Sequence, residues 1–194
     1  MTTYDGSTAL LVVDLQHDFA DPAGSLYVQG GEDVVPIANA EIAKARGGGA
    51  TVLYTQDWHP EHTPHFSQDG GPWPVHCVRE TWGGEFHDDL VVEGPIVRKG
   101  EDGTDGYSGF SVRDPDSGER KDTILHEALR AAGVKRLVIV GLATDYCVVE
   151  TVLDARVLGY PVEVLSAGIR AVDLEPGDGT RAIGRMRDAG AEIS

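Results

Sequence analysis

The sequence has few cysteines, few basic residues and no long apolar run. Two cysteines among 194 residues are too few for a disulfide scaffold, and we expect a reducing, cytoplasmic environment. Lys and Arg number 16 against 32 Asp and Glu, for a formal net charge of −16. Such a surface repels phosphate backbones and anionic lipids, so no nucleic-acid or membrane partner is expected. No stretch approaches the roughly 18 apolar residues of a membrane span, and the first residues, MTTYDGST, lack the form of a signal peptide.

Short apolar runs alternate with helix-like segments along the chain. This alternation predicts a three-layer α/β/α fold around a central six-stranded, mostly parallel sheet, in a single domain over residues 1–194. Ile124, Leu125, Ala128 and Leu129 are expected to face inward from one helix, which Thr123 can cap. The predicted strands are 9–13, 50–54, 95–98, 136–140, 161–165 and 191–193, and the predicted helices are 34–45, 123–133, 145–158 and 179–189.

Two long stretches do not fit the alternation. Residues 57–87 are dense in His, Pro, Trp and Gly, and residues 100–122 are polar and rich in turn-forming residues. Apolar periodic segments flank both stretches closely, so neither resembles a linker between domains. Long loops inside compact domains are more often functional than structureless, and we expect both to contribute to a site.

Four chemically capable residues follow predicted strands. Asp14 ends the first run, Asp57 follows the second, Lys99 ends the third, and Cys147 lies shortly after the fourth. Open parallel sheets bind ligands at the carboxyl ends of their strands. The four side chains are therefore expected to converge on one edge of the sheet.

Cys147 lies at the start of a predicted helix, which Thr144 or Asp145 can cap. Free backbone N–H groups and the helix dipole there favour a thiolate, and they are expected to lower the thiol pKa from about 8.5 toward neutrality. The same N–H groups can stabilise an oxyanion. Asp14 can serve as the general base, with a protonation state that depends on Lys99. The residues alone leave open that Cys147 is only a small buried apolar residue and that Asp14 only caps a turn.

Histidines cluster in the segment TQDWHPEHTPHFSQDGGPWPVHC. Mixed imidazole and carboxylate ligands suit one divalent first-row transition metal ion, Zn, Fe or Mn. A loop of surface histidines without a metal is the alternative. The candidate ligands are Asp57, His59, His62, His65 and His76.

These motifs together carry a family resemblance. The set VVDLQHDF, TQDWHPEHTPHF, WPVHC, VRKG, GYSGF and GLATDYC resembles the nicotinamidase/pyrazinamidase family, within the isochorismatase-like cysteine hydrolase superfamily, over about residues 9–158. The resemblance implies an isochorismatase-like fold with a metal-binding loop insertion at about 57–87. It also implies a catalytic triad of Asp14, Lys99 and Cys147, and metal ligands Asp57, His59, His76 and, as a fourth, His65. His62 is then a bystander.

The resemblance also assigns the surroundings of the nucleophile. It implies an oxyanion hole formed by the N–H groups of Ala143 and Cys147, and a cis peptide bond before Thr144. His17 stands where family members commonly have Asn, and it is not expected to take part in the chemistry. The implied substrate-binding residues are Phe19, Trp73, Tyr107 and Ala143.

The implied activity is hydrolysis of nicotinamide to nicotinate and ammonia through a Cys thioester, with the metal ion orienting the ring. Pyrazinamide is expected to be hydrolysed as well, the cellular role being NAD salvage. The protein is expected to be a monomer or a homo-oligomer whose partner is this small-molecule substrate. Three alternatives remain at this point: a superfamily amidase or hydrolase for carbamoyl, ureido or isochorismate substrates; hydrolysis by metal-activated water with Cys147 inert; and a non-enzymatic metal-binding protein.

Overall fold

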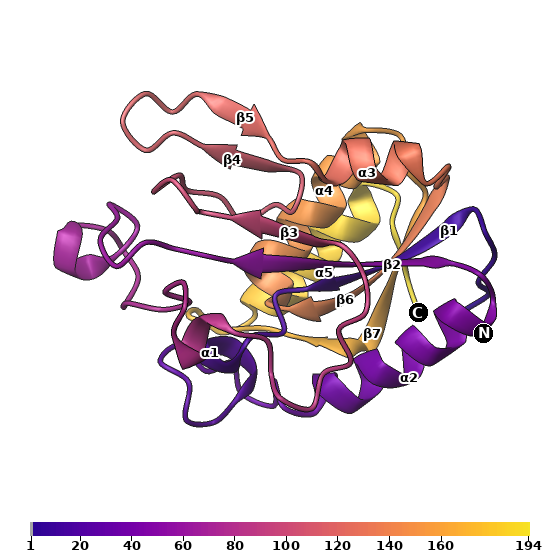
Figure 1. Cartoon of the computed structure of the whole chain (residues 1–194), viewed down its shortest axis with the longest axis horizontal. Helices are drawn as coiled ribbons and strands as arrows, with labels where there is room; N and C mark the ends of the chain where they lie inside the picture. Colours follow the sequence, from indigo (N-terminus) through magenta and orange to yellow (C-terminus); the bar gives the residue numbers. More distant parts are fainter. Residues whose placement is uncertain (1) are drawn as a thin grey trace.

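A six-stranded parallel sheet forms the centre of the computed structural model, which describes residues 2–194. The strand order is β3-β2-β1-β6-β7-β8, and all neighbouring pairs run parallel. This confirms the predicted six-stranded sheet (Figure 1). The strands are β1 (Thr8–Val13), β2 (Thr51–Asp57), β3 (Ile96–Lys99), β6 (Arg136–Leu142), β7 (Val162–Arg170) and β8 (Glu192–Ile193).

The central strands are apolar because both of their faces are covered. All six residues of β1 are buried, and they alternate between the two cores of the molecule. Leu11 and Val13 join one core, while Leu10 and Val12 join the other. Continuous apolar runs of this kind are typical of parallel strands between two helical layers.

Helices cover both faces of the sheet (Figure 1). Leu125 of α3, Val152 of α4 and Met186 of α5 belong to one core, and Ala38 and Ile42 of α2 belong to the other. The helices are α1 (His17–Ala20), α2 (Val34–Gly47), α3 (Leu125–Ala131), α4 (Val149–Val157) and α5 (Asp178–Asp188), and the π-helical turn η3 (Thr144–Val148) leads into α4.

The start of α3 differs from the prediction. Thr123 Oγ1 accepts a hydrogen bond from the Leu125 N–H at 3.2 Å, but the N-cap position of the helix is occupied by Ile124 and not by Thr123. Ile124 was predicted to face inward, and this is wrong because its side chain is 62% exposed. The helix begins only at Leu125, so Ile124 lies in the preceding turn, outside the apolar stripe.

The two irregular stretches have different structures. Residues 57–87 begin at the last residue of β2, and their helical elements are the short 3₁₀ turns η1 (Ser67–Asp69) and η2 (Trp82–Gly84). Residues 100–122 contain an antiparallel pair that the sequence did not predict, β4 (Ser111–Arg113) and β5 (Arg120–Asp122), drawn beside the edge strand β3 in Figure 1. Across residues 2–194, no helix combines the length and apolar character needed to cross a bilayer.

Candidate active site and metal centre

The four residues that follow the strands lie together at the carboxyl edge of the sheet. Lys99 Nζ lies 2.8 Å from Asp14 Oδ2 and 3.4 Å from Cys147 Sγ, and it also donates to the Asp57 carboxylate. Asp57 and Lys99 are paired residues at the ends of β2 and β3. All four side chains are buried. The ammonium of Lys99 therefore touches the thiol and both carboxylates.

The backbone turns sharply at Asp14 to place its carboxylate beside Lys99. Asp14 follows β1 directly and has a φ of 49°, in the left-handed region that few non-glycine residues adopt. Its N–H donates to the Thr55 carbonyl at 3.2 Å, and its Oδ1 accepts from Thr55 Oγ1 at 2.6 Å. β2 thus fixes both the backbone and the side chain of Asp14.

Burial governs where the protons lie. It raises the pKa of the Cys147 thiol well above its usual value, although the Lys99 ammonium lowers it in part. The prediction of a pKa near neutrality is therefore wrong, because the loss of water around the buried thiolate outweighs the cation and the helix start. Burial likewise raises the pKa of Asp14, against the opposing effect of Lys99. The site accordingly holds a thiol next to a carboxylate with an increased affinity for a proton.

The pKa of Asp57 shifts in the opposite direction to those of Cys147 and Asp14. Burial alone would raise its pKa, but Lys99, together with His59 and His76 at the low pH where they are protonated, outweighs burial and lowers it to about 2. The pKa of Lys99 is raised well above its usual value, because Asp14 and Asp57 outweigh its desolvation. Asp57 is therefore an anion at neutral pH and faces Lys99 on one side and the histidines on the other.

The turn that carries Cys147 differs in detail from the prediction. Thr144 and Asp145 do not have the predicted capping role. The N-cap residue of η3 is Ala143, which has an extended backbone, and no side chain caps this turn. Asp145 instead accepts hydrogen bonds from the N–H groups of Val172 and Asp173, at 2.9 and 2.8 Å, beyond the end of β7. The cis peptide bond lies between Leu142 and Ala143, one residue earlier than expected, where β6 ends and the chain turns.

An aromatic pocket opens in front of Cys147. Trp73 Nε1 donates to the hydroxyl of Tyr107 at 3.0 Å, and Tyr146 packs edge-on against Trp73 with ring centroids 4.9 Å apart. Burial raises the pKa of Tyr107 to about 12, so its hydroxyl stays protonated. Tyr146 was not among the predicted pocket residues. Its position next to Cys147 in the sequence is the one feature that could have indicated it. The lining includes all the predicted pocket residues: Phe19, Trp73, Tyr107, Ala143 and Cys147, together with Asp57, His65, His76 and Tyr146.

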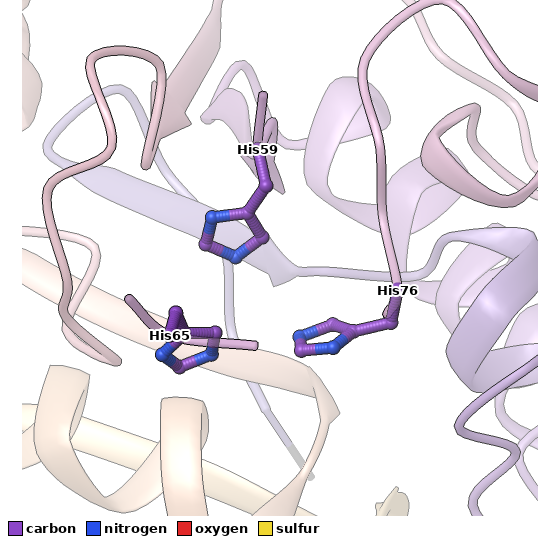
Figure 2. A group of neighbouring side chains, drawn as sticks. All are labelled: His59, His65 and His76. Atoms are coloured by element: carbon purple, nitrogen blue, oxygen red, sulfur yellow. The ribbon is translucent and has the colours of Figure 1, made fainter. Parts of the chain in front are cut away.

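Three histidines point toward one another beside this pocket (Figure 2). His59, His65 and His76 are buried, and each places one ring nitrogen within 4.8 Å of the others. His76 Nδ1 lies 2.7 Å from the Pro74 carbonyl, to which it can donate, leaving Nε2 free. Neither ring nitrogen of His59 has a hydrogen-bond partner among residues 2–194. Buried imidazoles with unpartnered nitrogens fit a metal ion, which would satisfy them.

Carboxylates surround this histidine cluster. Asp105 Oδ1 lies 2.8 Å from His65 Nδ1, and Asp57 Oδ2 lies 3.9 Å from His59 Nε2. Burial lowers the pKa of His59 to about 4, so the ring is neutral and able to bind a metal at neutral pH. Imidazoles with a nearby carboxylate suit zinc, iron or manganese. Asp105 lies in a polar loop, and no motif in the sequence marks it as part of a site.

Two further residues organise the segment 57–87. Gln16 Oε1 accepts from the Asp57 N–H at 2.8 Å, and its Nε2 donates to the Asp57 carbonyl at 2.7 Å, so the backbone of Asp57 is held on both sides. Asp18 Oδ2 accepts from the Cys77 N–H at 2.7 Å. Cys77 is fully buried. His62, the expected bystander, is exposed and pairs with Asp69.

The chain is thus an α/β protein whose parallel sheet carries a buried thiol, ammonium and carboxylate together at its carboxyl edge. Residues 8–194 match the isochorismatase domain family. The chain belongs to the isochorismatase family.

Proteins similar to the chain span nearly its whole length. The nicotinamidase of Escherichia coli (strain K12) is 39% identical over 203 residues, covering 95% of this chain and 93% of that protein. The zinc complex of the pyrazinamidase of Pyrococcus horikoshii has a TM-score of 0.86 at 40% identity, with 97% and 98% of the two chains covered. PnC1 from L. infantum, in complex with nicotinate, has a TM-score of 0.89 at 34% identity, covering 100% of this chain and 95% of the other.

Proposed function

We propose that this chain is a nicotinamidase that hydrolyses nicotinamide to nicotinate and ammonia, and pyrazinamide to pyrazinoate and ammonia. The observation that carries the proposal is the contact of Lys99 with both Cys147 and Asp14 at the end of an aromatic pocket. The similarity to nicotinamidases and pyrazinamidases over nearly the whole chain supports the same activity.

The reaction begins with proton transfer from the Cys147 thiol to Asp14. Because burial raises the pKa of both groups, the thiol is protonated at rest and a neighbouring carboxylate with high proton affinity can act as its base. The thiolate attacks the carboxamide carbon and forms a tetrahedral oxyanion. The N–H groups of Ala143 and Cys147 are proposed to stabilise that oxyanion. Lys99 stabilises the negative charge on sulfur and on Asp14.

Collapse of the tetrahedral intermediate breaks the carbon–nitrogen bond. Asp14 returns its proton to the departing nitrogen, which leaves as ammonia, and an acyl thioester remains on Cys147. Asp14 then accepts a proton from a water molecule that attacks the thioester. Nicotinate is released and the thiol is restored, so Asp14 alternates between base and acid.

The pocket orients the aromatic ring of the substrate. Phe19 and Trp73 are proposed to enclose the ring, with Tyr107 held in place by the Trp73 hydrogen bond. We propose that His59, His65, His76 and Asp57 hold one divalent transition metal ion, from a metal-binding loop spanning about residues 57–87. Such an ion supplies a Lewis acid for the ring nitrogen of the substrate, which it can meet directly or through water.

Zinc is the proposed ion, because three imidazoles and a carboxylate suit it and the Pyrococcus horikoshii pyrazinamidase forms a complex with zinc. A reducing, cytoplasmic location is also proposed, since both cysteines are free and a thiol nucleophile must stay reduced. The physiological role that follows from nicotinamide hydrolysis is a step in NAD salvage.

Ammonia release from three amides tests the proposal. Nicotinamide and pyrazinamide share a ring nitrogen and a carboxamide, whereas benzamide keeps the carboxamide and lacks the nitrogen. We expect release from the first two, little from benzamide, and loss of release after chelation with recovery on adding Zn²⁺. No release from folded, zinc-loaded protein would refute the activity. Full activity after alkylation of Cys147 would instead indicate attack by metal-activated water.

A further inference from the structure

A second group of metal-ligand side chains lies outside the pocket. His17, Asp21 and His87 each place one ligand atom within 4.8 Å of the others, and none of them lines the pocket at Cys147. His17 is 2% exposed and stacks on Trp82, with ring centroids 4.4 Å apart. Nothing in the proposed reaction uses these three residues. The burial of His17 is therefore not explained by the proposed reaction.

The contacts of His17 leave one of its ring nitrogens available. Its Nε2 lies 3.3 Å from Asp88 Oδ1, while its Nδ1 is buried and has no hydrogen-bond partner in the described part of the chain. A carboxylate on one ring nitrogen fixes the tautomer in which the other carries a free electron pair. Metal-binding histidines commonly have this carboxylate–imidazole arrangement.

Asp21 and His87 supply the other donors. Asp21 Oδ1 accepts from the Ala23 N–H at 2.8 Å, so Oδ2 is free, and Oδ2 lies 3.9 Å from His87 Nε2. His87 Nδ1 accepts a hydrogen bond from the Asp89 N–H at 3.2 Å. Binding of an ion through Nε2 would place the ring proton on Nδ1 and break that exposed hydrogen bond.

An ion can reach His87 from solvent. His87, Glu32 and Asp89 line a surface cavity, and its two carboxylates attract a cation.

We propose that His17, Asp21 and His87 form a second metal site that binds a divalent transition metal ion such as Zn²⁺. Two imidazoles and one carboxylate, with water completing the shell, are a suitable ligand set for this ion. The site would join α1, which follows β1, to the chain after η2. It would thereby clamp α1, whose Phe19 lines the catalytic pocket, to the chain after η2, and its role would be structural.

Zinc content per chain tests this site directly. Wild-type protein and variants are saturated at micromolar free Zn²⁺, freed of excess ion, and analysed for zinc by elemental mass spectrometry. The variants are Asp21→Asn and His87→Gln, which keep side-chain size, and the control is His126→Gln on α3. Ammonia release from nicotinamide shows that each variant is folded, because none of the three residues lies in the catalytic pocket.

We expect both site variants to hold one zinc ion less per chain than the wild type, and the His126→Gln control to match the wild type. Zinc is also expected to raise the melting temperature less in the two variants, since binding stabilises only the folded state. Wild-type zinc content in either variant would overturn the second site. A His59→Ala variant that holds no zinc at all would also overturn it, because the second site should still bind one ion.

Discussion

Replacing Lys99 by Met would remove a cation that contacts both Asp14 and Asp57. Lys99 is 2% exposed, and the two carboxylates beside it are buried as well. Methionine fills nearly the same volume, so the change deletes charge rather than packing. Breaking a buried ion pair by removing one partner costs about 3–5 kcal/mol of stability, because the other charge stays buried without compensation. With a slope of about 2 kcal/mol per molar urea, the unfolding midpoint should fall by about 1.5–2.5 M.

The pH dependence of this loss has a definite sign. In the wild type, Lys99 and the histidines hold the pKa of Asp57 at about 2, below the value of about 3.9 in an unfolded chain. Asp57 therefore stabilises the fold above pH 4, and this stability is lost as the pH falls through 2. Without Lys99, burial raises the carboxyl pKa values above the unfolded value, so protonation at lower pH favours the folded state. The penalty should accordingly be largest near pH 8 and shrink toward pH 5.

Urea unfolding at several pH values, followed by fluorescence, measures both effects. Lys121→Met, an exposed lysine on β5, is the matched control and should change stability by less than about 0.5 kcal/mol. The double variant Lys99→Met with Asp14→Asn should regain part of the stability and none of the activity. A loss below about 1 kcal/mol for Lys99→Met, or one that grows toward pH 5, would refute this electrostatic reasoning.

Two further substitutions test the histidine cluster. Gly100→Ala would place a methyl group 2.5 Å from His59 Nδ1 at a φ of 85°, so metal affinity should fall at least about tenfold in a zinc-competition titration. Gly70→Ala, at a φ of 97° with nothing within 4 Å, controls for backbone strain and should leave that affinity unchanged. Asp105→Asn removes the carboxylate beside His65 Nδ1 and should weaken zinc binding about 10- to 100-fold; wild-type affinity would show that Asp105 does not orient the ring.

The strands and the residues that end them could be predicted from sequence because burial on both faces leaves a strong signal. A run such as 9–13 is apolar throughout, and a charged residue at its end, Asp14, is conspicuous. Since parallel strands end at a common edge, the proximity of Asp14, Lys99 and Cys147 follows from the strand map.

Other features leave no such signal. The strands β4 and β5 are short and largely exposed, so their residues show no apolar alternation. Asp105 and Tyr146 act through contacts made by tertiary folding, and neither the acid nor the aromatic stands out from its neighbours. The thiol pKa of Cys147 was mispredicted because it depends on the depth of burial, which local sequence does not specify.

Ammonia release from nicotinamide by a Cys147→Ala variant tests the central claim most directly. Metal content on the same sample establishes that the histidine cluster is intact, and Cys77→Ser controls for the loss of a buried thiol. The thioester mechanism predicts a fall of at least about 10⁴-fold for Cys147→Ala, by analogy with removal of other covalent nucleophiles. It also predicts retained metal and near wild-type turnover in folded Cys77→Ser. Substantial turnover by metal-loaded Cys147→Ala would contradict covalent catalysis at this cysteine.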